Sequence, residues 1–263
     1  MPAAAPSRLS HVARIARHEL RDAWRSRAVV ALGVVFALLA AGAAVVGAAR
    51  FVADQEQRQR YQAMVGQQFA DQPDRHPHRV SHYGYLVFRP RAPLGFFDSG
   101  IESYAGTSLF LEAHRQNTAN FSSASQGGSS RFGELTLATV LQVFLPLFVL
   151  AIAAVSVTRE RESGTLALLA CQGLSWRTVL AGKLAGVLAV VSTVALPGVI
   201  VACAWLSRTA GAGWTADTLA RAILLGVAHA AFLALCAAAG VLVSARHRTS
   251  RGALTVVVSL WFV

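Results

Sequence analysis

The sequence predicts an all-α integral membrane protein, a polytopic helical bundle with one large extracytoplasmic insertion. Of its 263 residues, 54% are hydrophobic and only 14% are charged, whereas a soluble domain carries about 25% charged residues. The apolar residues gather in long blocks, and several blocks reach the roughly 20 residues that a helix needs to cross the hydrocarbon of a bilayer. Between the first two blocks lies a polar stretch of domain size, residues 50–133.

Residues 1–27 are expected to contain an amphipathic helix that lies in the membrane interface. Over residues 9–27 the apolar side chains recur at spacings of three and four, which is the period of a helix with one apolar face. A second face carries Arg14, Arg17 and Arg21, which suit contact with anionic lipid headgroups. The alternative is a positively charged flank that is only partly helical.

Four apolar blocks are expected to cross the membrane as helices. These are residues 28–49, 134–157, 184–206 and 221–243. The first block is too long for the apolar core of a cleaved signal peptide, so we expect a retained signal anchor. Pro146 lies within the second block, where a missing backbone N–H can kink a helix. His229 lies within the fourth, either as a functional group or, in the favoured interpretation, as a neutral imidazole bonded to a neighbouring helix.

Polar segments separate the later blocks. They are the basic segment 158–183, the short loop 207–220 and the basic loop 244–252. From Ala253 the sequence is apolar again, and residues 253–263 are interpreted as the start of a fifth span. Because that stretch has about half the length of a span, we expect the sequence to be truncated within it.

Arginines in the short segments predict the orientation. They are concentrated in residues 1–27, 158–183 and 244–252, which share one side of the membrane if the spans alternate, while the loop 207–220 carries only Arg208. The positive-inside rule then places the N-terminus in the cytoplasm and the insertion outside. The net charge of +11 follows from this topology, so a nucleic-acid partner is not expected.

The insertion holds four of the eight histidines of the chain: His76, His78, His82 and His114. Imidazoles at spacings of two and four can bind zinc or copper. A proline separates the first two, however, and no Cys or Met accompanies them. The favoured interpretation is therefore solvated or loop-packing histidines, and no metal site is assigned.

The segment that follows the second span has a distinctive order of residues. Four charges alternate from Arg159 to Glu162, Gly164 interrupts them, and a short leucine run follows. A short helix lying across the cytoplasmic face here would let a partner push on the second and third spans together. The alternative is an ordinary charged loop that caps two helices.

This segment resembles the type-2 ABC transporter permeases. The resemblance rests on Glu-Arg-Glu-Ser-Gly-Thr-Leu at residues 160–166, the leucine run, and Gly182-Lys183 before the next span. In that family the segment after the second span is the coupling region, which docks on the ATPase. The resemblance implies that the contact includes Glu160, Glu162, Gly164 and Thr165, with Leu166, Leu168 and Leu169 packing the short helix.

The insertion resembles one bacterial subgroup of these permeases, which has a large, poorly characterised periplasmic insertion between the first two spans. The stretches that carry this likeness are residues 76–83, 93–98, 111–115 and 131–135. The resemblance implies a six-span unit in the bacterial cytoplasmic (inner) membrane. It also implies a dimer with a second copy or a paralogue, and a working direction that is mostly export.

The resemblance implies a non-catalytic subunit. The sequence has no Gly-x-x-x-x-Gly-Lys-Ser/Thr motif, so ATP and magnesium are expected in a partner ATPase and no cofactor in this chain. Metalloprotease and serine-hydrolase motifs are absent as well. The alternative function is an ATPase-linked membrane scaffold or assembly factor that acts on periplasmic partners, for example in metal-centre maturation, without transport.

Overall fold

The computed structural model describes residues 7–100, 106–114, 119–120, 135–209 and 215–262. The chain divides into two compact units. The bundle unit comprises Met1–Gly42, Val140–Val201 and Leu219–Val263, and the sheet unit comprises Ala43–Thr139 and Ala202–Thr218. Parts of the predicted insertion and of the predicted loop 207–220 lie outside the described residues.

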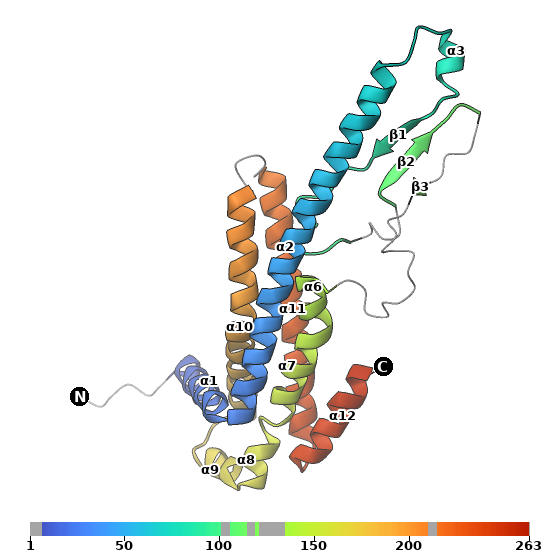
Figure 1. Ribbon diagram of the computed structural model, residues 1–263. Helices are drawn as coiled ribbons and strands as arrows, with labels where there is room; N and C mark the ends of the chain where they lie inside the picture. The colour runs from blue at the N-terminus through green and yellow to red at the C-terminus, as the bar shows by residue number, and fades with distance from the viewer. Residues whose placement is uncertain (1–6, 101–105, 115–118, 121–134, 210–214, 263) are drawn as a thin grey trace. The chain divides into compact units, whose positions relative to one another are not determined.

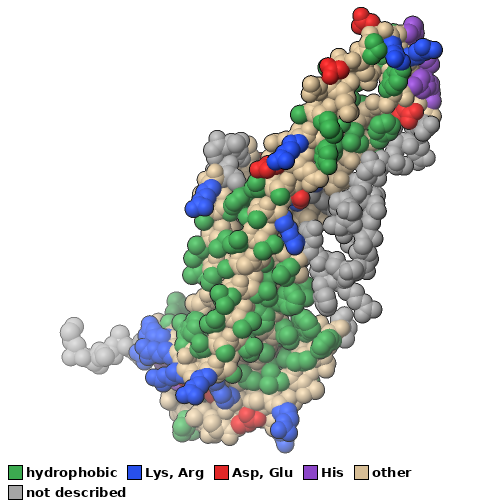
Figure 2. Space-filling model, in the orientation of Figure 1, with side chains coloured by type: hydrophobic (Ala, Val, Ile, Leu, Met, Phe, Trp, Pro, Cys, Tyr) green, Lys and Arg blue, Asp and Glu red, His purple; other side chains and the backbone are tan. Residues whose placement is uncertain are grey.

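Four helices are long and apolar enough to cross a membrane. They are α2 (Arg27–Ala70), the composite helix α6–α8 (Leu137–Glu162), α10 (Trp176–Thr209) and α11 (Ala216–Arg246). Within the bundle unit, large apolar side chains such as Leu38, Leu224 and Leu235 are exposed on these helices, and Figure 2 shows apolar side chains over their surface. Apolar side chains on outward faces are typical of helices surrounded by lipid, which agrees with the predicted polytopic helical class.

Shorter helices complete the bundle unit. They are α1 (Arg8–Arg25), α9 (Thr165–Cys171) and α12 (Ser250–Phe262). α12 is an apolar helix of 13 residues that covers most of the predicted start of a fifth span.

The second span is irregular around Pro146. It consists of α6 (Leu137–Thr139), the π-helical turn η1 (Val140–Phe144), α7 (Leu145–Ala154) and α8 (Thr158–Glu162). Pro146 lies in the first turn of α7, where the missing N–H of proline is tolerated. In the irregular stretch, the carbonyl of Val143 accepts a hydrogen bond of 2.8 Å from Trp261 Nε1 of α12.

In the bundle unit α7 lies beside α12 (Figure 1), and the core of the unit forms around it. One buried cluster joins α7 to α12 through Leu150, Ala154, Ala253 and Val257. On another side, Gly240 of α11 lies so close to Ala153 that a Cβ atom at position 240 would overlap it. The second span is therefore the central helix of the unit, and 61% of its most apolar stretch is buried.

The sheet unit contains the last part of α2, the short α3 (Pro77–Val80) and three antiparallel strands in the order β1-β2-β3. The strands are β1 (Tyr85–Phe88), β2 (Ser108–Leu111) and β3 (Ala119–Asn120). An all-α chain was predicted, so this small sheet is a difference. Its physical reason is local, because the run Tyr-Leu-Val-Phe in β1 has high strand propensity and Pro90 follows two residues later.

Aromatic side chains join β1 to the polar part of α2. Tyr61 stacks on Phe88 with ring centroids 6.2 Å apart, and Phe69 meets Tyr85 edge-on at 5.4 Å. Nearby, Arg91 forms an ion pair of 2.8 Å with Asp54. These contacts hold the polar part of α2 against the strand.

Candidate functional site

The segment 158–183 begins with two short helices rather than the single one predicted. α8 ends at Glu162, and Gly164 separates it from α9 with a φ of +77°, a left-handed conformation that glycine adopts without steric cost. The Ser163 and Thr165 hydroxyls lie 2.8 Å apart, and Thr165 Oγ1 donates to the carbonyl of Glu160 at 3.3 Å. Gly164 and Thr165 thus fix the angle between the two helices.

Glu160 turns into the bundle instead of toward a surface contact. Its carboxylate pairs with the ammonium of Lys183, and Glu19 Oε1 lies 2.5 Å from the same Nζ atom. The side chain of Lys183 is fully buried (0% exposed), and it is the only lysine in the sequence. We call Glu19, Lys183 and Glu160 the buried ion triad; it joins α1, α10 and α8. The inward turn has a physical reason, since a buried ammonium needs paired carboxylates.

Two glycines on α10 allow α1 to approach the triad. A Cβ atom at Gly182 would overlap Ile15, and one at Gly186 would overlap the side chain of Glu19. Small residues four apart permit such close packing of helices in membranes. Burial raises the pKa of the Glu19 carboxyl, and the Lys183 ammonium opposes that rise. The sequence pointed to Lys183 only as part of the family-like Gly-Lys pair and did not point to Glu19, although a lone lysine inside Gly-x-x-x-Gly was a signal that could have indicated a buried ion pair.

Arg161 joins α8 to the C-terminal end of α11. Its Nη2 atom donates to the carbonyl of Ala245 at 2.9 Å, and Nη1 donates to the carbonyl of His247. Next to this contact, Ser244 Oγ accepts from the backbone N–H groups of Val157 and Thr158 at 3.0 and 3.1 Å. The last carbonyl groups of a helix lack partners within it, so a guanidinium placed there stabilises both elements.

Glu162 joins α8 to the first residue of α12. Its two carboxylate oxygens accept from the backbone N–H and the hydroxyl of Ser250, each at 2.7 Å. This contact satisfies one of the N–H groups left free at a helix N-terminus. Three consecutive charged side chains of α8 therefore bind three different elements. Glu160 binds Lys183 of α10, which also holds Glu19 of α1, while Arg161 binds the end of α11 and Glu162 binds α12.

α9 is held much more loosely. Leu166 and Leu169 are half-buried and line a hollow of about 490 Å³. Leu174, Trp176 and Val179 are among the other apolar residues of its wall. Leu168 was expected to pack with the other two leucines, but its side chain is 64% exposed. It lies on the opposite face of the helix from Leu166 and Leu169.

The bundle unit also contains a polar contact between two spans. His229 Nε2 of α11 lies 3.0 Å from the Gln142 amide in η1, and His229 Nδ1 lies 2.8 Å from the carbonyl of Leu225. With Nδ1–H donating to that carbonyl, Nε2 accepts from Gln142, which is the bonding pattern of a neutral imidazole. The structure thus agrees with the favoured interpretation of His229 as a histidine bonded to a neighbouring helix.

Comparison with known families supplies the identity. The profile of the family described as ABC-2 family transporter protein matches residues 13–263. The chain belongs to the ABC-2 family. It is therefore an ABC transporter permease with transmembrane helices, a multi-pass membrane protein of a family whose members are typically non-catalytic and generally pair with an ABC ATPase. A search of curated proteins finds no match.

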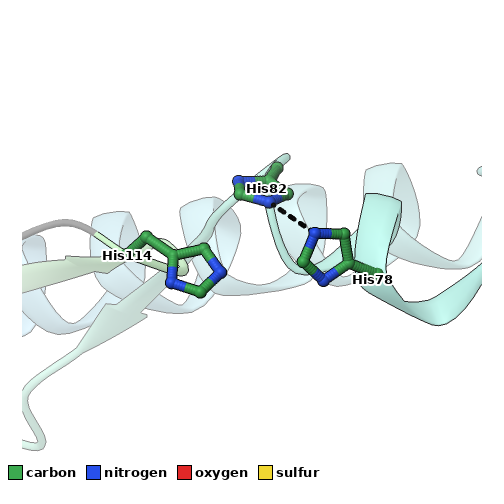
Figure 3. Close-up of side chains that lie close together, drawn as sticks. All are labelled: His78, His82 and His114. Atoms are coloured by element: carbon green, nitrogen blue, oxygen red, sulfur yellow. Dashed lines mark hydrogen bonds between the residues drawn. The ribbon is translucent and has the colours of Figure 1, made fainter.

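The sheet unit of this permease brings together three of its four insertion histidines. The imidazoles of His78, His82 and His114 lie side by side (Figure 3). His76 does not join them, because its Nδ1 accepts from the backbone N–H of His78 at 3.2 Å and caps α3. The sequence spacing suggested His76, His78 and His82 equally, so the structure separates a capping histidine from the cluster.

Proposed function

We propose that this permease is the transmembrane subunit of an ATP-driven exporter and that residues 158–170 couple it to a separate ATPase. ATP and magnesium bind to that partner, and this chain carries the mechanical link. The observation that supports the link is the set of contacts made by α8, in which Glu160, Arg161 and Glu162 each bind a different part of the bundle unit.

The two short helices have different roles, because α9 binds the ATPase and α8 transmits its movement to the bundle unit. α9 presents the exposed Leu168 and Thr165, and the ATPase docks on this face. A displacement of α9 passes through Ser163 and Gly164 to α8. Charged groups bond α8 to α1, α10, α11 and α12, so those helices move with it. This movement changes the side of the membrane to which the path between the spans is open.

The topology we propose places the coupling end in the cytoplasm of a bacterium, at its inner membrane. Figure 2 shows basic side chains gathered at the end of the bundle unit where α1 and α8 lie, as the positive-inside rule requires of a cytoplasmic end. Residues 50–133 then form a periplasmic insertion. A second copy of the permease, or a paralogue, completes the membrane part, with one ATPase for each.

The test is recovery of the ATPase with the full-length tagged permease in mild detergent, followed by mass spectrometry and an ATPase assay. Leu168→Asp is expected to reduce recovery at least about tenfold, because a charge replaces an apolar contact at a desolvated interface. Glu162→Ala is expected to leave recovery unchanged and to lower the stimulation of ATP hydrolysis, since only the connection to α12 is lost.

Met64→Asp is the matched control, because Met64 is also an exposed apolar residue on a helix surface but lies in the sheet unit. It should recover the ATPase as well as the wild type does. Equal recovery with Leu168→Asp and the control would sink the docking assignment. The absence of any ABC ATPase from a folded wild-type preparation would contradict the transporter function itself.

A further inference from the structure

Three histidines of the sheet unit form a compact nitrogen cluster (Figure 3). His82 Nε2 lies 3.4 Å from His78 Nε2, and one ring nitrogen from each of His78, His82 and His114 lies within 4.8 Å of the others. The ring centroids are separated by 4.9, 5.3 and 5.8 Å. All three side chains are exposed, so an ion from solution can reach them.

The fold itself creates the cluster from residues that are distant in sequence. His78 lies in α3 and His82 in the turn that directly follows it, four residues later, a spacing that places side chains on one face when the backbone stays near helical. The antiparallel pairing of β1 with β2 ends at Tyr85 and Leu111, and it brings the turn that precedes β1, with His82, beside the residues that follow β2, with His114. A backbone hydrogen bond of 3.0 Å from Ala113 N to Ser81 O holds the two segments together there.

The backbone at His114 is in an unusual conformation. His114 has a φ of +60° and is the non-glycine residue with positive φ among those that the structure describes. Such a conformation costs a side-chain-bearing residue about 1–2 kcal/mol; His adopts it more readily than most residues, and strained backbone clusters at functional sites. Here it directs the imidazole toward the other two rings.

The closest pair of nitrogens in the cluster has the spacing of two ligands on one metal ion. Two nitrogens bound to one tetrahedral zinc at about 2.1 Å lie about 3.4 Å apart, which matches the separation of His78 Nε2 and His82 Nε2. The same two atoms are also within hydrogen-bond distance when no ion is bound (Figure 3). Imidazole donors without thiolates or carboxylates favour Zn²⁺ or Cu²⁺ over Cu⁺, Ca²⁺ or Mg²⁺.

We propose that His78, His82 and His114 bind one divalent transition-metal ion of the Zn²⁺ class, with water at the fourth position. Three histidine ligands and one exchangeable position are the arrangement of an open zinc site. The ion joins the turn after α3 to the chain that follows β2, and it stabilises the sheet unit. This site is independent of the coupling function, because no residue of the bundle unit takes part in it.

The experiment uses the full chain in mild detergent, purified with an affinity tag that contains no histidine. After chelation, the protein is dialysed against Zn²⁺, and bound zinc is counted by mass spectrometry. The expected result is one zinc per chain. Replacement of zinc with Co²⁺ should give the intense visible absorption of a tetrahedral site. His114→Asn should weaken binding at least about tenfold, since loss of even an outer-shell partner costs this much.

Two matched substitutions separate ligand loss from misfolding. Asn tolerates positive φ, so His114→Asn removes the imidazole and keeps the backbone. His76→Asn keeps a capping group at α3 and should bind zinc like the wild type. The proposal is overturned if the wild type takes up no zinc, if His76→Asn loses zinc as His114→Asn does, or if Co²⁺ gives only the weak spectrum of an octahedral ion.

Discussion

α8 and α9 are neighbours in the chain, yet they are held in opposite ways. α8 has five residues and binds the bundle unit through buried or bonded charges, while α9 has seven residues and rests on two half-buried leucines beside a hollow. Helices this short have little stability of their own. The comparison teaches that polar contacts fix the first helix, whereas the second is left available to a partner.

Lys183→Met is expected to have the largest effect on this arrangement. Removing the ammonium leaves the carboxylates of Glu19 and Glu160 without their buried partner. Loss of one member of a buried ionic group typically costs about 3–5 kcal/mol. Thermal unfolding of the purified permease in detergent measures the change.

A triple variant tests whether charge balance is the cause. Glu19→Gln and Glu160→Gln added to Lys183→Met remove all three charges, and we expect much of the lost stability to return, because apolar or neutral replacements of buried ion groups are often tolerated. No recovery would mean that shape, rather than charge, connects α1 to α10.

Arg161→Ala should come next. It removes the donors to the carbonyls of Ala245 and His247, and loss of charged hydrogen bonds at a partly buried site costs about 1.5–3 kcal/mol. Arg159→Ala is the matched control, since Arg159 forms a 3.6 Å pair with Asp22 at a partly exposed position, worth about 0–1 kcal/mol. Equal losses in thermal stability would show that Arg161 is not a special connection.

Gly164→Ala should cost about 1–2 kcal/mol, the penalty for a Cβ atom in left-handed backbone. The space around Gly164 is open, so the effect isolates backbone strain from crowding. Gly164→Asn should cost less, because Asn adopts positive φ more readily. Chemical denaturation of the two variants compares them, and a larger loss with Asn would contradict a left-handed joint.

Leu168→Ala should have the smallest effect on stability, within about 0.5 kcal/mol, as for surface substitutions generally. Leu169→Ala should cost more, because Leu169 lines the hollow beside α10. The unfolding temperatures of the two variants measure this difference between the exposed and the half-buried leucine of α9. A strong destabilisation by Leu168→Ala would mean that α9 packs on its exposed face in solution.

Local sequence features predicted the parts of the fold that depend on nearby residues. Block length identified the apolar helices, and Pro146 marked the irregular second span. The contact between Glu19 and Lys183 joins residues 164 positions apart. The spacing of apolar residues predicts local helices but cannot predict a contact over that distance. The family resemblance placed Glu160 at the ATPase contact, and nothing in the local sequence indicated its pairing with Lys183.

The histidine cluster also depends on a contact between distant residues that the local sequence does not predict. His78 and His82 are close for local reasons, but His114 reaches them only through the pairing of β1 with β2. The register of two short strands is not fixed by their sequences alone, because a shift of one residue changes the face of every side chain. Structure was needed to distinguish the three clustered histidines from His76.

Because Lys183 is the only lysine of the chain and is fully buried, its amine can report when α1 separates from α10. An amine-reactive label, or a protease that cuts after lysine, finds this residue only in molecules that have opened there. The rate of modification then measures local opening against global unfolding. A single mass shift at residue 183 would reveal in intact membranes whether ATP turnover loosens that contact.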